Sequence, residues 1–123
     1  MSLYWIVIAL QVVVGLGLLN VWLLRPKSAT PYRGGAAASL KEEFAVYGLP
    51  EAVFYLVGAL KIAAGAVLLL GLFLPLPVQL AGGVVAVLMV GAIAMHLKVG
   101  DPLKRSLPAA AMLLMSLGIV ILS

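Results

Sequence analysis

Lys61 is the residue whose position in this sequence most strongly suggests chemistry. It lies ten positions into a hydrophobic stretch that begins near Glu51, about 15 Å along a helix. A charge at that depth in a membrane costs about 2.5–3.5 kcal/mol on insertion scales. Three roles fit Lys61: a polar contact between helices, a binding site for an anion or for the carbonyl of a lipid-like ligand, or a proton carrier.

Small and amide residues lie where they could surround Lys61. Gly58 and Gly65 stand at i−3 and i+4 on the same helical face, which predicts space beside the ammonium and a place in the bundle interior. Gln11 and Asn20 are polar residues of the first hydrophobic stretch, at depths that bracket Lys61. Either amide oxygen could therefore accept a hydrogen bond from the ammonium.

No acidic residue lies deep enough in the hydrophobic stretches to neutralise Lys61. Glu51, at the edge of the same stretch, is too far along the helix axis to pair with it. The missing counter-ion favours an anionic or carbonyl ligand as the partner of the ammonium.

His96 is the single histidine and lies at the end of the third hydrophobic stretch. One histidine cannot supply the two axial ligands of a membrane haem, and no carboxylate cluster accompanies it to bind a metal. We expect His96 to hydrogen-bond to the loop that follows, with proton relay or quinone binding as alternatives. Tyr55 is a further ligand-binding candidate, although interfacial anchoring is the simpler role for it and for the other loop tyrosines.

The composition excludes most other classes of protein. Hydrophobic residues make up 65% of the 123 residues and charged residues 10%, whereas a soluble domain has roughly 25% charged residues. There are no cysteines for thiolate metal sites or iron–sulfur clusters. No nucleophile–base pair or phosphate-binding loop is present, which argues against an autonomous enzyme. The net charge of +4 lies in short loops, which favours anionic lipid headgroups over nucleic acid as its partner.

Four hydrophobic stretches predict an all-α integral membrane four-helix bundle that forms a single transmembrane domain over residues 1–123. The expected spans are 3–24, 51–74, 78–97 and 106–122. Trp5 and Trp22 are expected at the two membrane interfaces. The small-residue pairs Ala59–Ala63 and Gly82–Ala86 are expected to pack helices within the chain rather than form a dimer face.

A short interfacial amphipathic helix is expected at 39–47, between the first and second spans. Ser39 is the candidate N-cap with Glu42 three residues later, and Gly48 with Pro50 should end the helix. The expected apolar face is Leu40, Phe44 and Tyr47. The charged residues expected off that face are Lys41, Glu42 and Glu43.

The basic residues predict the topology. The segments 25–50 and 98–105 hold seven lysines and arginines, whereas the 75–77 turn and the C-terminus hold none. The positive-inside rule places both basic loops in the cytoplasm and both termini outside.

Four segments carry a family resemblance: PYRGG at 31–35, EFAVYGLP at 43–50, LVGALKIAAGAVLLLGL at 56–72 and HLKVGDPLKRSLPA at 96–109. In these the sequence resembles the DoxX-like family of small membrane proteins of the bacterial inner (plasma) membrane. The residues of its loop motif are Pro31, Tyr32, Arg33, Gly34, Gly35, Glu43, Phe44, Tyr47, Gly48 and Pro50.

The resemblance implies a four-helix membrane bundle. The wider DoxX superfamily is linked to quinone-reducing thiosulfate oxidation and to membrane oxidoreductase complexes, and other members resemble a chaperone for receptor assembly. DoxX proteins proper tend to carry an acidic residue where this sequence has Lys61, whereas the DoxX-like branch often has lysine.

The residues and the resemblance together predict an accessory subunit that binds a quinone or lipid-like molecule near Lys61 and serves a membrane oxidoreductase. It would have no intrinsic cofactor, and electrons would come from a partner. Two alternatives remain: a small homo-oligomeric transporter or channel for an anionic or small solute, and a structural or chaperone-like membrane module.

Overall fold

The computed structural model describes residues 3–24 and 39–123, and every regular element in these ranges is helical. The helices are α1 (Leu3–Leu19), continued by the π-helical turn η1 (Asn20–Leu24), α2 (Leu40–Val46), α3 (Glu51–Leu70), α4 (Val78–Lys98), the 3₁₀ turn η2 (Leu103–Ser106) and α5 (Leu107–Leu122).

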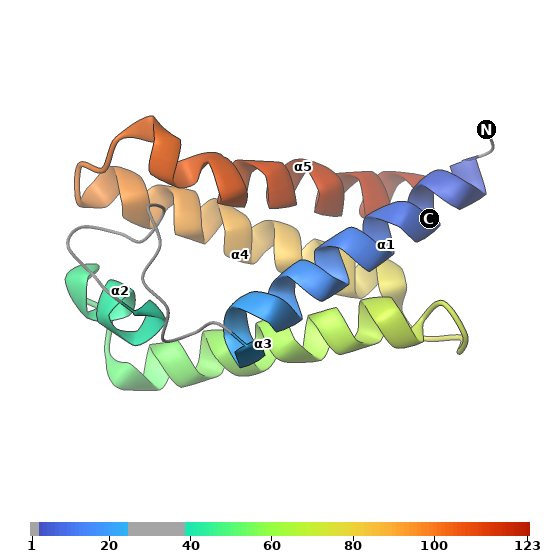
Figure 1. The fold of residues 1–123 in the computed structure, drawn as a ribbon, viewed down its shortest axis with the longest axis horizontal. Helices are drawn as coiled ribbons and strands as arrows, with labels where there is room; N and C mark the ends of the chain where they lie inside the picture. The colour runs from blue at the N-terminus through green and yellow to red at the C-terminus, as the bar shows by residue number, and fades with distance from the viewer. Residues whose placement is uncertain (1–2, 25–38) are drawn as a thin grey trace.

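The four long helices lie side by side, and the short α2 sits at one end of them (Figure 1). Helix α1 packs on α3 and α5, and α4 packs on the same two helices. Three of the described helices are long and apolar enough to cross a membrane, namely Glu51–Leu70, Val78–Lys98 and Leu103–Leu122, and the apolar Tyr4–Leu19 is shorter. These features confirm the predicted all-α membrane bundle.

The helix boundaries differ from the predicted ones where glycine and proline interrupt the chain. Helix α3 ends at Leu70 rather than at 74, because the chain turns at Gly71. A Cβ on residue 71 would collide with Val78 Cγ2, so glycine is needed for this close turn into α4. The fourth span begins as a 3₁₀ turn at Leu103, before Pro108 in the first turn of α5.

The core is formed where small residues let the helices approach. A Cβ on Gly82 would lie 3.1 Å from Ile119 Cγ2 of α5, and Gly82 and Ala86 are both buried. The expectation for this pair is confirmed. The expectation for Ala59 and Ala63 is wrong, because both are exposed.

Helix α3 instead approaches α1 through Gly65 and the η1 turn through Gly58, which lie two turns apart on one face of α3. A Cβ on Gly65 would lie 3.3 Å from the carbonyl oxygen of Gly15. The space at the two glycines that were expected to leave room beside Lys61 is therefore filled, by α1 at Gly65 and by the Trp22 indole of η1 at Gly58.

The short helix α2 has the predicted caps. Ser39 Oγ accepts a hydrogen bond from the Glu42 backbone N–H at 3.2 Å, and Gly48 has a φ of 78°, the left-handed conformation that ends many helices. The expected position of Glu43 is wrong. Glu43 lies four residues before Tyr47 and so shares its face, and the structure buries it.

Candidate functional site

An aromatic cluster joins three elements at the α2 end of the bundle. Trp22 of η1, Phe44 of α2 and Phe54 of α3 contact one another, with ring centroids 5.4 Å apart for Trp22–Phe54 and for Phe44–Phe54, and 5.9 Å apart for Trp22–Phe44. Trp22 is buried, with 7% of its surface exposed, whereas Trp5 is 60% exposed. Trp22 therefore packs inside the protein, where its indole fills the space that Gly58 leaves on α3, and its depth at a membrane interface stays a prediction.

Lys61 extends its ammonium over this cluster. Its Nζ lies 5.3 Å from the centroid of the Trp22 ring, within the range of a cation–π interaction. Over residues 3–24 and 39–123, the ammonium makes no hydrogen bond.

Three other candidate residues make no hydrogen bond to Lys61 in the described part of the chain. The buried Gln11 donates from Nε2 to the carbonyl oxygen of Leu68 at 3.0 Å. Asn20 is half-buried at the start of η1. Tyr55 is 58% exposed and donates to Glu51 Oε1 at 3.3 Å.

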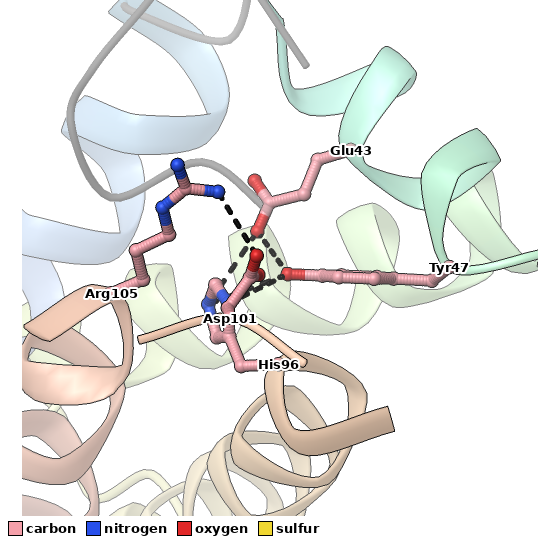
Figure 2. A network of polar contacts seen from close by, with 5 residues as sticks. All are labelled: Glu43, Tyr47, His96, Asp101 and Arg105. Carbon is pink, nitrogen blue, oxygen red and sulfur yellow. Dashed lines mark hydrogen bonds and ion pairs between the residues drawn. The ribbon is translucent and has the colours of Figure 1, made fainter. Parts of the chain in front are cut away.

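Figure 2 shows a polar network of five side chains, which adjoins the aromatic cluster through the Phe44–Tyr47 ring contact, with centroids 6.4 Å apart. Its members are Glu43, Tyr47, His96, Asp101 and Arg105. Tyr47 O–H donates to Glu43 Oε1 at 2.5 Å, and the Tyr47 hydroxyl oxygen lies 3.3 Å from His96 Nδ1. His96 Nδ1 lies 2.8 Å from Asp101 Oδ2, and Arg105 Nη1 donates to Asp101 Oδ1 at 2.9 Å. The network thus links α2, α4, the following loop and η2.

The carboxylate of Asp101 fixes the orientation of His96. An ionised carboxylate can only accept, so His96 Nδ1–H is the donor to Asp101. Its Nε2 then faces Glu43 Oε1 at 3.8 Å. The predicted hydrogen bond from His96 to the 98–105 loop is present, and the imidazole is 4% exposed.

Two further contacts hold α2 against the bundle. Lys98 Nζ donates to the backbone carbonyl of Tyr47 at 3.0 Å. Lys41 Nζ lies 2.7 Å from Glu51 Oε1, and the hydrogen bond to this carboxylate raises the pKa of Lys41. Both partners of the second pair are exposed, so it contributes little to stability.

The loop-motif residues divide into two groups. Glu43, Phe44 and Tyr47 belong to the two clusters, while Gly48 and Pro50 form the turn into α3. The segment 31–35, with Pro31, Tyr32, Arg33, Gly34 and Gly35, lies outside the described residues.

Asp101 and Arg105 were not among the candidate residues. They form an i, i+4 ion pair, a spacing that is visible in the sequence. Their link to the distant Tyr47 and Glu43 depends on the fold. Gly100, with a φ of 72°, reverses the chain so that the Asp101 backbone N–H reaches the carbonyl of His96 at 3.0 Å.

Tyr47 is a permanent donor in this network. Burial raises its pKa, and the hydrogen bond to Glu43 raises it further. The phenol therefore stays protonated at physiological pH and keeps its hydrogen bond to the carboxylate.

Replacing Tyr47 with phenylalanine is expected to lower the free energy of unfolding by about 1.5 kcal/mol. The ring contacts remain, but the buried Glu43 carboxylate loses its O–H donor. The measurement is SDS-induced unfolding in mild detergent, followed by circular dichroism. Tyr55→Phe is the matched control because its exposed hydroxyl makes a longer bond. Equal effects of the two substitutions would contradict the assigned role of Tyr47.

A comparison with protein-family models matches the DoxX-like family over residues 35–119. This range includes α2 to α4 and most of α5, with all five residues of the polar network. Comparisons with curated proteins and with solved structures found no match. The predicted resemblance is confirmed, and this small integral membrane protein belongs to the DoxX-like family.

Proposed function

We propose that this chain is an accessory membrane subunit that binds the polar head of a quinone or lipid-like molecule at Lys61 and serves a partner oxidoreductase. The observation that carries the proposal is the state of the Lys61 ammonium. It has three N–H donors, yet in the described part of the chain it contacts an aromatic ring rather than a hydrogen-bond acceptor.

A ligand oxygen would give the Lys61 ammonium the hydrogen-bond acceptor that it does not find among the described residues. Unmade hydrogen bonds of a charged donor in an apolar span are costly, so an incoming carbonyl or ester oxygen gains more here than in water. The aromatic rings of Trp22, Phe44 and Phe54 adjoin the same site. A quinone matches this chemistry because it presents carbonyl oxygens on a flat ring that packs well against aromatic side chains.

The basic residues at the α2 end of the bundle indicate how the protein is oriented in the membrane. The α2 end carries Lys41, Lys98, Lys104 and Arg105 among the described residues. We place this end at the cytoplasmic face of a bacterial inner membrane, with both termini on the other side, in line with the positive-inside rule. The polar head of the ligand would then lie in the cytoplasmic half of the bilayer.

Substituting Lys61 with methionine is expected to remove the bound molecule. The protein is purified in mild detergent, and its small-molecule content is identified by native mass spectrometry. Wild type should carry a quinone or lipid at near-stoichiometric occupancy, and Lys61→Met should lower that occupancy by about tenfold or more, since it removes a charge-assisted hydrogen bond.

Lys104→Met is the matched control because Lys104 is an exposed lysine of the loop after α4. It should retain the wild-type content. A wild-type protein without any bound molecule would overturn the proposal, as would a Lys61→Met protein that keeps its ligand. A lower free energy of unfolding in Lys61→Met, with Lys104→Met unchanged, would then assign Lys61 a packing role.

A further inference from the structure

Helix α2 is held to the bundle in a different way from the four long helices. The hydrophobic core takes its buried members from α1, α3, α4 and α5. Among the described helices, the backbone of α2 lies close to that of α3, at one end of the bundle (Figure 1). With seven residues, α2 is too short to persist as a helix without tertiary contacts. Those contacts therefore decide whether α2 stays docked.

Polar contacts join α2 to α4. The Tyr47 hydroxyl oxygen lies 3.3 Å from His96 Nδ1, and Glu43 Oε1 lies 3.8 Å from His96 Nε2. The exposed Lys98 donates from Nζ to the Tyr47 backbone carbonyl at 3.0 Å. A short segment held by a few such bonds opens at a lower free energy than an apolar core does. Helix α2 can therefore be released while the four long helices stay packed.

The turn after α2 is suited to act as a hinge. Gly48 has a φ of 78°, and Pro50 is already the N-cap of α3. A hinge needs a few residues at the end of an element that absorb changes in φ and ψ. The chain can thus change direction here without disturbing α3.

Phe44 is the side chain through which α2 adjoins the Lys61 site. Its ring centroid lies 5.9 Å from that of Trp22 and 5.4 Å from that of Phe54. The same Trp22 ring lies 5.3 Å from the Lys61 Nζ. Movement of α2 would withdraw Phe44 from the indole, and an aromatic ring of a ligand could then pack in its place.

We infer that α2 is a lid, which opens as a unit to admit a ligand to the Trp22–Lys61 site and is held closed by its polar contacts with α4. This inference rests on the proposed ligand site and adds the step that controls access to it. Binding requires the open state, so the association rate constant follows the population of that state.

The first measurement is amide hydrogen exchange of the full chain in mild detergent, followed by mass spectrometry. Lys98→Met removes the bond to the Tyr47 carbonyl and leaves the residues of the ligand site in place. The amides of α2 should exchange about fivefold faster in this variant, and those in the middle of α3 should be unchanged. Lys104→Met, at another exposed lysine, is the control and should exchange like wild type.

The second measurement is the rate of ligand binding. In a Trp5→Phe background, decylbenzoquinone is mixed rapidly with the protein and the quenching of Trp22 is followed. Lys98→Met should raise the association and dissociation rate constants by the same factor of about five, with Kd nearly unchanged, because the closed state is weakened equally with and without ligand. A fixed α2 predicts an unchanged association rate constant.

The outcomes separate the lid from the ligand site. Unchanged exchange of α2 in Lys98→Met, or an equal increase in Lys104→Met, would overturn the lid and leave the ligand site standing. Faster exchange with an unchanged association rate constant would do the same. Absence of saturable, Lys61-dependent quenching would overturn the ligand site itself, and with it this inference.

Discussion

Replacing Asp101 with alanine is expected to lower the free energy of unfolding by about 3 kcal/mol. The Asp101 side chain is 4% exposed and bridges His96 and Arg105 at 2.8 and 2.9 Å. Its removal leaves a partly buried guanidinium without its carboxylate and a buried imidazole without its acceptor. SDS-induced unfolding in mild detergent, followed by circular dichroism, measures the change.

Lys104→Ala is the control for the Asp101 substitution, because it alters an exposed neighbour in the same turn. It should change the free energy of unfolding by no more than about 0.5 kcal/mol. If Asp101→Ala had an equally small effect, the network would not hold α2, α4 and η2 together as described.

Replacing Gly58 with alanine is expected to destabilise the protein by about 2 kcal/mol through overpacking. The new Cβ would lie 2.6 Å from Trp22 Cζ3, so the indole must move away from α3. That movement also withdraws the ring from beneath the Lys61 ammonium. The measurement combines the unfolding free energy with the emission spectrum of Trp22 in a Trp5→Phe background.

Gly83→Ala is the matched control for Gly58→Ala. Gly83 lies inside α4, and no atom of the described residues lies within 4 Å of its Cβ position. Alanine there should be neutral or stabilising by up to about 1 kcal/mol, because it favours the helix over the unfolded chain. A Gly58→Ala protein with wild-type stability and an unshifted Trp22 emission spectrum would contradict the packing of Trp22 against α3.

The fold could be predicted from the sequence because lipid imposes simple rules on it. Long apolar stretches must form helices that satisfy their own backbone, and glycine and proline mark their ends. The prediction for α3 was too long because hydropathy continues past Leu70, whereas the turn at Gly71 is set by contact with Val78 of the next helix. Such a contact is not visible in the pattern of one segment.

The site could be predicted only in part. Lys61 was found because a charge in an apolar span is conspicuous in any sequence. Its neighbour Trp22 was not, because it comes from another helical segment. The burial of Glu43 was missed as well, because Glu43 was expected off the apolar face of its helix. The i, i+4 spacing of Glu43 and Tyr47 would have placed both residues on the same buried face of the helix. Gln11 was expected beside Lys61, but depth along a helix does not fix direction around it, and the amide bonds to the Leu68 carbonyl instead.

The most direct test of the proposed ligand site uses Trp22 as a built-in probe. Trp5→Phe leaves Trp22 as the remaining tryptophan, and decylbenzoquinone is titrated into the purified protein while its fluorescence is recorded. A ligand at Lys61 predicts saturable quenching that is lost in the Trp5→Phe, Lys61→Met protein. Quenching that rises without saturation, and equally in both proteins, would show that the quinone only partitions into the detergent and would contradict a binding site at Lys61.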